Sequence, residues 1–71
     1  MEEISLREGD DYIKLGQLLK KANMMFSGVD AKMVILDGLV SVNGEVELRR
    51  GKKIYPGDVV TFEGESVKVV R

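Results

Sequence analysis

The stretch from Ser27 to Gly44 constrains the fold of this chain most, because helix, stop, strand and turn signals follow one another directly. Ser27 is followed three residues later by Asp30, a spacing typical of a capped helix start. Apolar residues then recur at helical spacing as far as Ile35. Gly38 stands where a glycine in the left-handed conformation would end the helix. The sequence therefore predicts a helix that begins after Ser27 and ends before Gly38.

A strand and a tight turn are predicted directly after this helix. Val40 and Val42 alternate with their neighbours as in a strand. Asn43-Gly44 is the strongest short-range signal for a hairpin turn. Together with the helix, this strand and turn form the unit from which the rest of the fold is predicted.

The first half of the chain contains one further strand and one further helix. Glu2–Arg7 alternates polar and apolar residues and predicts a strand. Residues 12–22 carry apolar side chains at helical spacing, and the sequence leaves open whether this helix starts at Tyr12 or at Leu15. Gly16 within it is unfavourable for a helix and is consistent with close packing.

The second half predicts short strands and turns. Pro56-Gly57-Asp58 has the residues of a type II turn. The runs 59–62 and 67–70 are typical of two strands of a hairpin. We therefore predict one α+β domain over residues 1–71, with a two-helix unit followed by a small antiparallel sheet of four to five short strands.

Composition excludes several classes of function. The chain has no cysteine and no histidine, which excludes disulfides, thiolate chemistry and zinc sites built from these ligands. Paired carboxylates do not stand out from the turns and caps, so we expect neither an enzyme nor a cofactor. No apolar run is long enough to span a bilayer, and the acidic start is unlike a signal peptide; we expect a cytoplasmic protein with no membrane partner.

Charge is unevenly distributed along the chain. The formal net charge is only −1, but residues 14–53 carry eight bases and four acids. The flanking segments are acidic and hide this excess in the total. Arg49-Arg50-Gly51-Lys52-Lys53 alone holds four of the eleven basic residues. Such segregation can produce a basic face on an acidic protein, although a solvated basic loop has the same sequence.

The start of the second predicted helix has the properties of an anion site. Free N–H groups and the helix dipole favour an anion there. Gly28 has no side chain to block a phosphate, and Lys32 projects from the same side of the helix. If the fold returns Arg49–Lys53 to this helix start, one face gathers about five cations, and Lys20 could add a sixth.

The ordered motif S-x-x-x-A-x-x-x-I-x-x-G-x-V-x-V-N-G resembles the RNA-binding domain named after ribosomal protein S-four. The matching residues are Ser27, Ala31, Ile35, Gly38, Val40, Val42, Asn43 and Gly44. The later P-G-D-x-V from Pro56 to Val60 also fits that domain. The S-G-x-x-A-K run at 27–32 and the basic run 49–53 look most like its small bacterial YaaA/YbcJ-type members, although larger relatives usually carry arginine where Gly28 stands.

The resemblance implies binding of structured RNA, often ribosomal, without catalysis. We expect ribosomal RNA or ribosomal particles as the partner of a monomer, and recognition of backbone and shape because the aromatic residues are few. The predicted RNA-binding residues are Lys20, Ser27, Gly28, Lys32, Asn43, Arg49, Arg50, Lys52 and Lys53.

A protein–protein docking module with a β-grasp-like scaffold is the alternative. Ubiquitin-like sulfur carriers share a V-N-G-E start and a late G-D turn, but they need a C-terminal Gly-Gly where this sequence has Val69-Val70-Arg71. We therefore expect docking without carrier chemistry under this alternative. Docking should be insensitive to salt and to the loss of Arg49 and Arg50, whereas RNA binding should not.

Overall fold

The computed structural model describes residues 1–22 and 28–71, which form two helices and seven strands. In chain order these are β1 (Glu2–Ser5), β2 (Ile13–Lys14), α1 (Leu15–Lys21), α2 (Gly28–Leu36), β3 (Val40–Val42), β4 (Glu45–Val46), β5 (Lys53–Ile54), β6 (Val59–Phe62) and β7 (Glu65–Val70). The α+β class is therefore confirmed. Ser27, the predicted cap of α2, lies outside the described residues.

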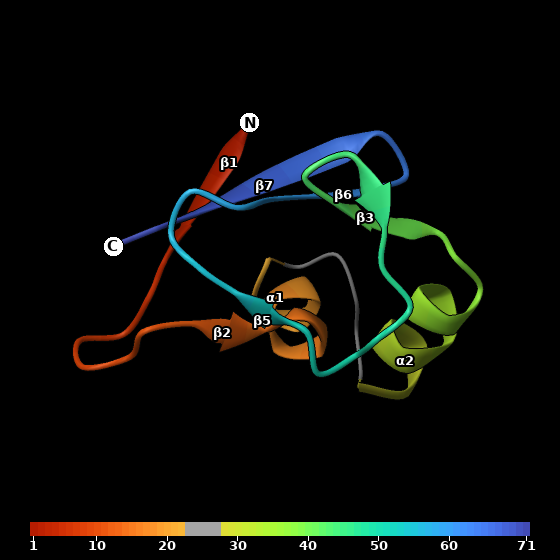
Figure 1. The fold of residues 1–71 in the computed structure, drawn as a ribbon, viewed down its shortest axis with the longest axis horizontal. Helices are drawn as coiled ribbons and strands as arrows, with labels where there is room; N and C mark the ends of the chain where they lie inside the picture. Colours follow the sequence, from red (N-terminus) through yellow and green to blue (C-terminus); the bar gives the residue numbers. More distant parts are fainter. Residues whose placement is uncertain (23–27) are drawn as a thin grey trace.

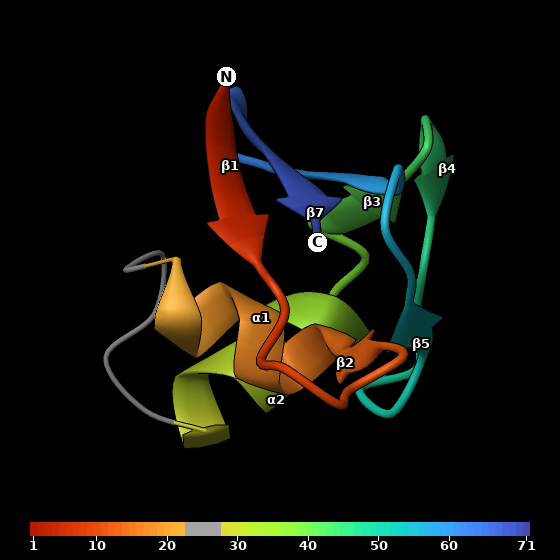
Figure 2. The ribbon, with the colours of Figure 1, turned by 90° about the vertical axis from the view of Figure 1, so that its left-hand side faces the viewer.

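The helices and the larger sheet form two layers (Figure 1). One layer is the sheet β1-β7-β6-β3-β4, and the other is the pair α1 and α2. The short pair β2–β5 lies beside α1, as Figure 2 shows from the side. This second sheet joins the segment before α1 to the end of the basic run at Lys53.

The larger sheet is mixed, which differs from the antiparallel sheet expected from the sequence. Strand β1 pairs in parallel with β7, in a register that places Ile4 opposite Val69. The other pairings of this sheet, β7–β6, β6–β3 and β3–β4, are antiparallel. Strands β1 and β7 come from the two ends of the chain, so no hairpin fixes their relative direction, and a parallel pair can form.

Helix α1 begins at Leu15, the later of the two predicted starts. The preceding residue, Lys14, has an extended backbone and belongs to β2. The side chain of Lys14, the N-cap residue, makes no capping hydrogen bond. The first N–H groups of the helix instead donate to carbonyl groups of a distant loop, which becomes the centre of the candidate site described below.

Helix α2 ends as the sequence predicted. Gly38 has a φ of 75° and donates its N–H to the carbonyl oxygen of Ile35, 3.1 Å away. The N–H of Leu39 donates to Val34 at 3.0 Å, which completes a Schellman motif. The turn at Asn43, with a φ of 51°, then reverses the chain between β3 and β4.

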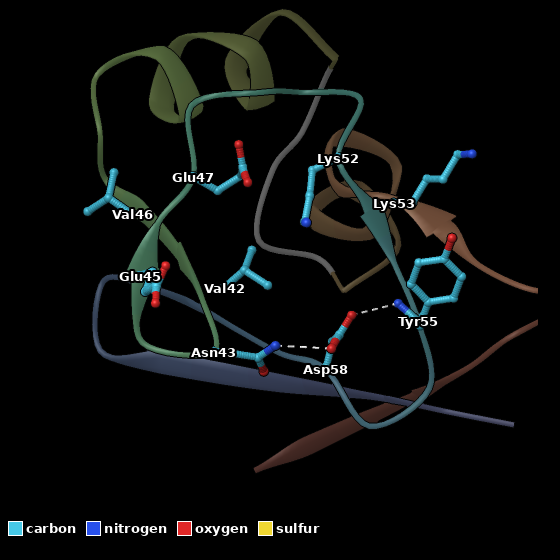
Figure 3. Close-up of a pocket in the computed structure, with 9 residues that line it drawn as sticks. All are labelled: Val42, Asn43, Glu45, Val46, Glu47, Lys52, Lys53, Tyr55 and Asp58. Atoms are coloured by element: carbon cyan, nitrogen blue, oxygen red, sulfur yellow. Dashed lines mark hydrogen bonds between the residues drawn. The ribbon is translucent and has the colours of Figure 1, made fainter.

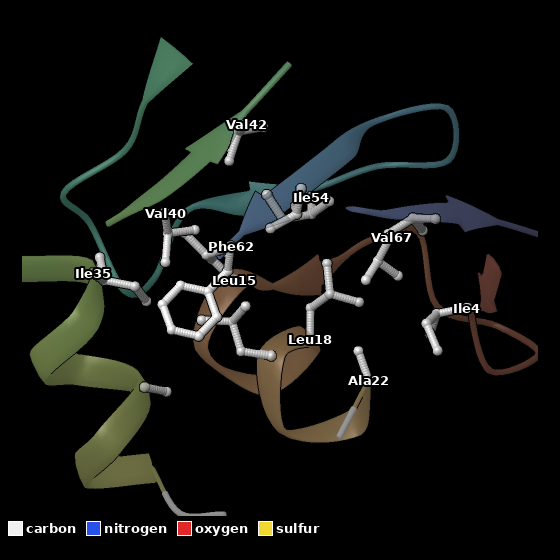
Figure 4. Packing of buried hydrophobic residues seen from close by; sticks show 14 residues of the cluster. Ile4, Leu15, Leu18, Ala22, Ile35, Val40, Val42, Ile54, Phe62 and Val67 are labelled. Atoms are coloured by element: carbon white, nitrogen blue, oxygen red, sulfur yellow. The ribbon is translucent and has the colours of Figure 1, made fainter. Parts of the chain in front are cut away.

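The core lies between the sheet and the helices (Figure 4). Fully buried side chains of α1, among them Leu15 and Leu18, meet Val40, Val60 and Val67 from the sheet layer. A fully buried side chain of this size contributes roughly 1.5–3 kcal/mol through removal from water. Ile54 of β5 is also fully buried, which ties the basic segment to the core.

Candidate functional site

The basic loop 49–53 is fixed to the start of α1. The N–H of Leu15 donates to the carbonyl oxygen of Lys52 at 2.9 Å, and that of Gly16 donates to Arg50 at 3.0 Å. These bonds satisfy two of the N–H groups that the first turn of a helix leaves free. They also hold the backbone of the loop against α1, while Arg49, Arg50 and Lys53 stay exposed. A structural requirement of the helix thus positions the cations.

Gly16 allows the Arg50 side chain to lie directly on α1. A Cβ atom at Gly16 would approach the Cγ atom of Arg50 to 2.7 Å, closer than real Cβ contacts. The predicted close packing at Gly16 is therefore confirmed, and its partner is a basic side chain. The direction taken by Arg50 depends on the absence of a side chain at this position.

Two hollows line this part of the surface and meet at Gly51. The first, here called the Lys20 hollow, is lined by Lys14, Gly16, Gln17, Lys20, Arg50 and Gly51. The second, here called the Lys53 hollow, is lined by Arg49, Gly51, Lys52, Lys53 and Tyr55. The two hollows together are called the basic surface, and six cationic side chains line them. Within residues 1–22 and 28–71, neither hollow has an acidic residue in its lining.

Arg49, a member of the basic surface, pairs with the acidic side chain of Glu47. Its Nε atom donates to Oε2 of Glu47 at 3.0 Å, and its Nη2 atom donates to Oε1 at 3.2 Å. The N–H of Arg49 donates to the same carboxylate. The hydrogen bonds from Arg49 lower the pKa of Glu47 to about 2. Glu47 therefore fixes the orientation of Arg49 and offsets part of its charge.

The sheet β2–β5 adds residues that the sequence analysis did not assign to the site. Lys14 lies opposite Lys53, and Ile13 lies opposite Ile54. Because side chains alternate along a strand, the two lysines share the face opposite to the isoleucines. Both lysines are exposed, whereas Ile54 is buried.

Tyr12 and Tyr55 lie together on one side of the lysine pair. Their ring centroids are 5.8 Å apart with an interplanar angle of 50°. The Nζ atom of Lys53 lies 5.0 Å from the centroid of the Tyr12 ring. Only the pairing of β2 with β5 unites these residues, which are about forty positions apart in the sequence, so no local pattern could have identified them.

Asn43 has a structural role at the edge of the basic surface. Its Nδ2 atom donates to Oδ1 of Asp58 at 3.0 Å, and its Oδ1 atom accepts from the N–H of Val59 at 2.9 Å. The other carboxylate oxygen of Asp58 accepts from the N–H of Tyr55 at 2.8 Å. Figure 3 shows the two bonds to Asp58 in a neighbouring hollow, into which Lys52 points.

The structure does not bring all predicted RNA-binding residues together. Lys20, Arg49, Arg50, Lys52 and Lys53 line the basic surface. Figure 2 shows the start of α2, where Gly28 stands, at the opposite end of the helix pair from the loop. The loop therefore returns to the start of α1 and not to that of α2. Lys32 is exposed on α2, and Ser27 lies outside the described residues.

Other kinds of site receive no support in the part of the chain that the structure describes. Within residues 1–22 and 28–71, no three acidic side chains gather into a group that could hold a metal ion. Over the same residues, neither helix is long and apolar enough to cross a membrane.

Comparison with known proteins agrees with this architecture. YbcJ of Escherichia coli (strain K12), a protein named for RNA binding, is 44% identical over 59 residues, covering 83% of this chain and 84% of YbcJ. RlbA of Bacillus subtilis (strain 168), a protein named for ribosome maturation, is 48% identical over 54 residues, covering 76% of each chain.

A solved structure extends the likeness to the whole chain. The solution structure of YbcJ from Escherichia coli matches with a TM-score of 0.73 and 41% identity, covering all of this chain and 89% of the other. That structure is described as revealing an "alfaL motif involved in RNA-binding". The family model of the S4 domain matches residues 4–70. This chain therefore belongs to the S4 domain family.

Proposed function

We propose that this protein binds structured RNA, with ribosomal RNA as the target, through the basic surface at the start of α1. The observation that carries the proposal is the meeting of the two hollows at Gly51, with six cations and no acid among the described residues of their linings. Lys52 and Lys53 also line the neighbouring hollow, which contains three acids. A protein with a net charge of −1 gains nothing in solubility from concentrating cations in this way. Binding of a polyanion across both hollows would account for this concentration of cations.

The charge pattern of the basic surface is electrostatically unfavourable in the free protein. Lys14 and Lys53 stand directly opposite each other, and like charges in such a pair destabilise a sheet. The first turn of α1 has no acidic residue, although the helix dipole favours one there. Phosphate groups bound between these side chains would offset both the repulsion between the lysines and the lack of an acid at the start of α1. Unfavourable charge of this kind is typical of a surface that binds an anion.

The fold supports recognition of RNA shape and backbone over base sequence. Loop and helix are joined by hydrogen bonds and a buried Ile54, so the cations are displayed on a rigid base. Basic side chains of this kind contact phosphates, which position a protein on a helix without reading its sequence. The family membership and the names of YbcJ and RlbA support RNA as the partner. We propose binding without catalysis, by a monomer in the cytoplasm.

Titration of a fluorescently labelled ribosomal RNA hairpin tests the proposal. We expect binding to weaken with salt at a log–log slope of roughly −3 to −4, as for about four phosphate contacts. The double variant Lys20→Gln, Arg50→Gln should bind at least about tenfold more weakly and reduce the slope by about two. Lys68→Gln, which removes an exposed cation from β7, is the matched control and should bind as the wild type does.

Circular dichroism separates loss of binding from loss of fold. A double variant with unchanged melting temperature and unchanged affinity would contradict the role of the basic surface. Sedimentation of the complex would show whether one copy binds each hairpin. A two-to-one complex would contradict the monomer.

Protein docking remains a second candidate because apolar side chains are exposed near the end of α2. Leu39, Val46 and Leu48 are each more than half exposed, and the last two lie within 4.0 Å of a Cβ atom built at Gly38. Binding that is insensitive to salt and is lost in Val46→Ser would favour docking over RNA. Strong salt dependence with Val46→Ser unchanged would favour RNA.

A further inference from the structure

We propose that the outer face of the β2–β5 sheet holds an unpaired nucleotide of the RNA, with its base stacked on Tyr55. This inference rests on the proposed RNA-binding function and specifies its ligand as helical RNA with a bulged or terminal unpaired nucleotide. The small number of aromatic residues in the sequence predicted no stacking surface. The pairing of β2 with β5 brings two of them together.

The outer face of the β2–β5 sheet carries one cross-strand lysine pair, and a pair of tyrosine rings lies next to it, just beyond the strand ends. Lys14 is in register with Lys53, and the flanking Tyr12 and Tyr55 form the ring pair described above. The two tyrosines therefore lie beside the two lysines on the exposed side of the sheet. A base on a ring and a phosphate on a neighbouring ammonium group is the combination by which proteins bind unpaired nucleotides.

Tyr55 is the better placed of the two rings. Its N–H donates to Asp58 and its carbonyl oxygen accepts from the N–H of Asp58 at 3.0 Å, so the backbone that carries the ring is held in a turn. The residue nevertheless remains 47% exposed. Tyr12 is half-buried and lies under the Lys53 ammonium group, which leaves Tyr55 for the base.

The tyrosine is also continuous with the basic surface. Tyr55 lines the Lys53 hollow together with Lys52 and Lys53, and Figure 3 shows its ring on the same side as the Lys53 side chain. An RNA strand held by the cations would therefore pass the ring. Stacking tolerates any base, so this contact selects unpaired structure and not sequence.

If the two tyrosines served only to shield the β2–β5 sheet from water, any apolar side chain of similar size would replace them, and an aromatic ring would not be required. The variants Tyr55→Leu and Tyr55→Phe separate these roles, because leucine keeps apolar cover while phenylalanine keeps the face. The RNA probes are three hairpins with one stem: fully paired, with a bulged adenosine, and with an abasic residue at the bulge. The abasic hairpin keeps the backbone distortion and removes the base.

We expect wild-type protein to bind the bulged hairpin about fivefold or more tightly than the abasic one. Tyr55→Leu should abolish this preference without changing affinity for the paired hairpin, and Tyr55→Phe should keep it. The chain has two tyrosines, so selective labelling reports directly on this face. Ring resonances of wild-type protein should move upfield with the bulged hairpin and not with the abasic one.

The outcomes distinguish this inference from the function on which it rests. Equal affinity of wild type for the bulged and abasic hairpins, both bound with strong salt dependence, would overturn the stacking contact and leave RNA binding intact. A preference that survives in Tyr55→Leu would also overturn it. Failure of wild type to bind any of the three hairpins would overturn both proposals. If Tyr55→Leu unfolds, the affinities of wild-type protein for the three hairpins and the chemical shifts of its tyrosine rings test the stacking contact without that variant.

Discussion

Lys14 and Lys53 lie directly opposite each other across the two-stranded sheet β2–β5. Both side chains are exposed, and Lys53 also rests over the ring of Tyr12. A pair of like charges at this position opposes the pairing of a sheet that has only two residues in each strand. The repulsion between Lys14 and Lys53 therefore lowers the stability of the free protein within the basic surface.

Lys14→Glu should strengthen the fold and weaken RNA binding. The substitution turns a repulsive cross-strand pair into an attractive one and places an acid at the start of α1, which together should add about 0.5 kcal/mol to the free energy of unfolding. It also removes a phosphate contact, so the affinity for an RNA hairpin should fall about tenfold or more. Urea denaturation and RNA titration measure the two effects.

Lys68→Glu is the control for this prediction. It makes the same change in net charge on β7, beside Glu3 of β1, away from the basic surface. We expect little change in affinity and no gain in stability. A Lys14→Glu protein that loses stability would show that the lysine pair serves the fold. One that binds RNA as tightly as wild type would show that Lys14 does not contact the RNA.

Gly16→Ala should weaken RNA binding without altering any charge. Its Cβ atom would meet the Arg50 Cγ atom at 2.7 Å and displace that side chain from α1. Alanine is a better helix former by roughly 1 kcal/mol, so α1 should persist. The loss in affinity should be about tenfold, comparable to one charged hydrogen bond.

The control for the glycine is the same change in an Arg50→Ala protein. Gly16→Ala should weaken binding no further there, because the side chain that it displaces is already absent. A further loss of affinity in that protein would mean that Gly16→Ala does not act through the position of Arg50.

Gly38→Ala should destabilise the domain. Gly38 has a φ of 75°, a conformation that costs a residue with a Cβ atom about 1 kcal/mol or more. For a domain of this size the melting temperature should fall by about 4–8 °C. Gly38→Asn should lose less, because asparagine tolerates the left-handed conformation. An unchanged melting temperature in Gly38→Ala would mean that α2 does not need the Schellman motif.

Stability should depend on Glu47 in acid. Hydrogen bonds from Arg49 lower the pKa of this carboxyl from 4.5 to about 2 in the folded protein. A lowered pKa stabilises the fold above the unfolded value, and this contribution is lost as the pH falls from about 4.5 towards 2. The difference in melting temperature between wild type and Glu47→Gln should therefore be constant near neutral pH and shrink across that window.

Arg49→Gln gives the comparison, since removing the guanidinium that donates to Glu47 should narrow this window. Carboxyl NMR of Glu47 would measure its titration directly. A midpoint near 4.5 in the folded protein would show that the bonds to Arg49 do not persist in solution.

The sequence by itself determined the local geometry of this protein. Gly38 and Gly57 adopt the positive φ values that their positions required, 75° and 97°. Asp58 closes the predicted turn by donating its N–H to Tyr55 at 3.0 Å. These features depend on the conformational preferences of a few consecutive residues, which are written in the sequence. The α+β class and the family followed from the same ordered signals.

Only the tertiary structure decided where the basic loop lies. The sequence offered the start of α2 as its neighbour, and the structure places it at the start of α1. There the N–H groups of Leu15 and Gly16, which have no partner within the helix, donate hydrogen bonds to carbonyl oxygens of the loop. The loop carbonyls need such donors as well. The same long-range pairing set Lys14 against Lys53 and Tyr12 beside Tyr55. Contacts of this kind depend on which distant segments form hydrogen bonds with each other and together bury Ile54. A local sequence pattern does not contain that information.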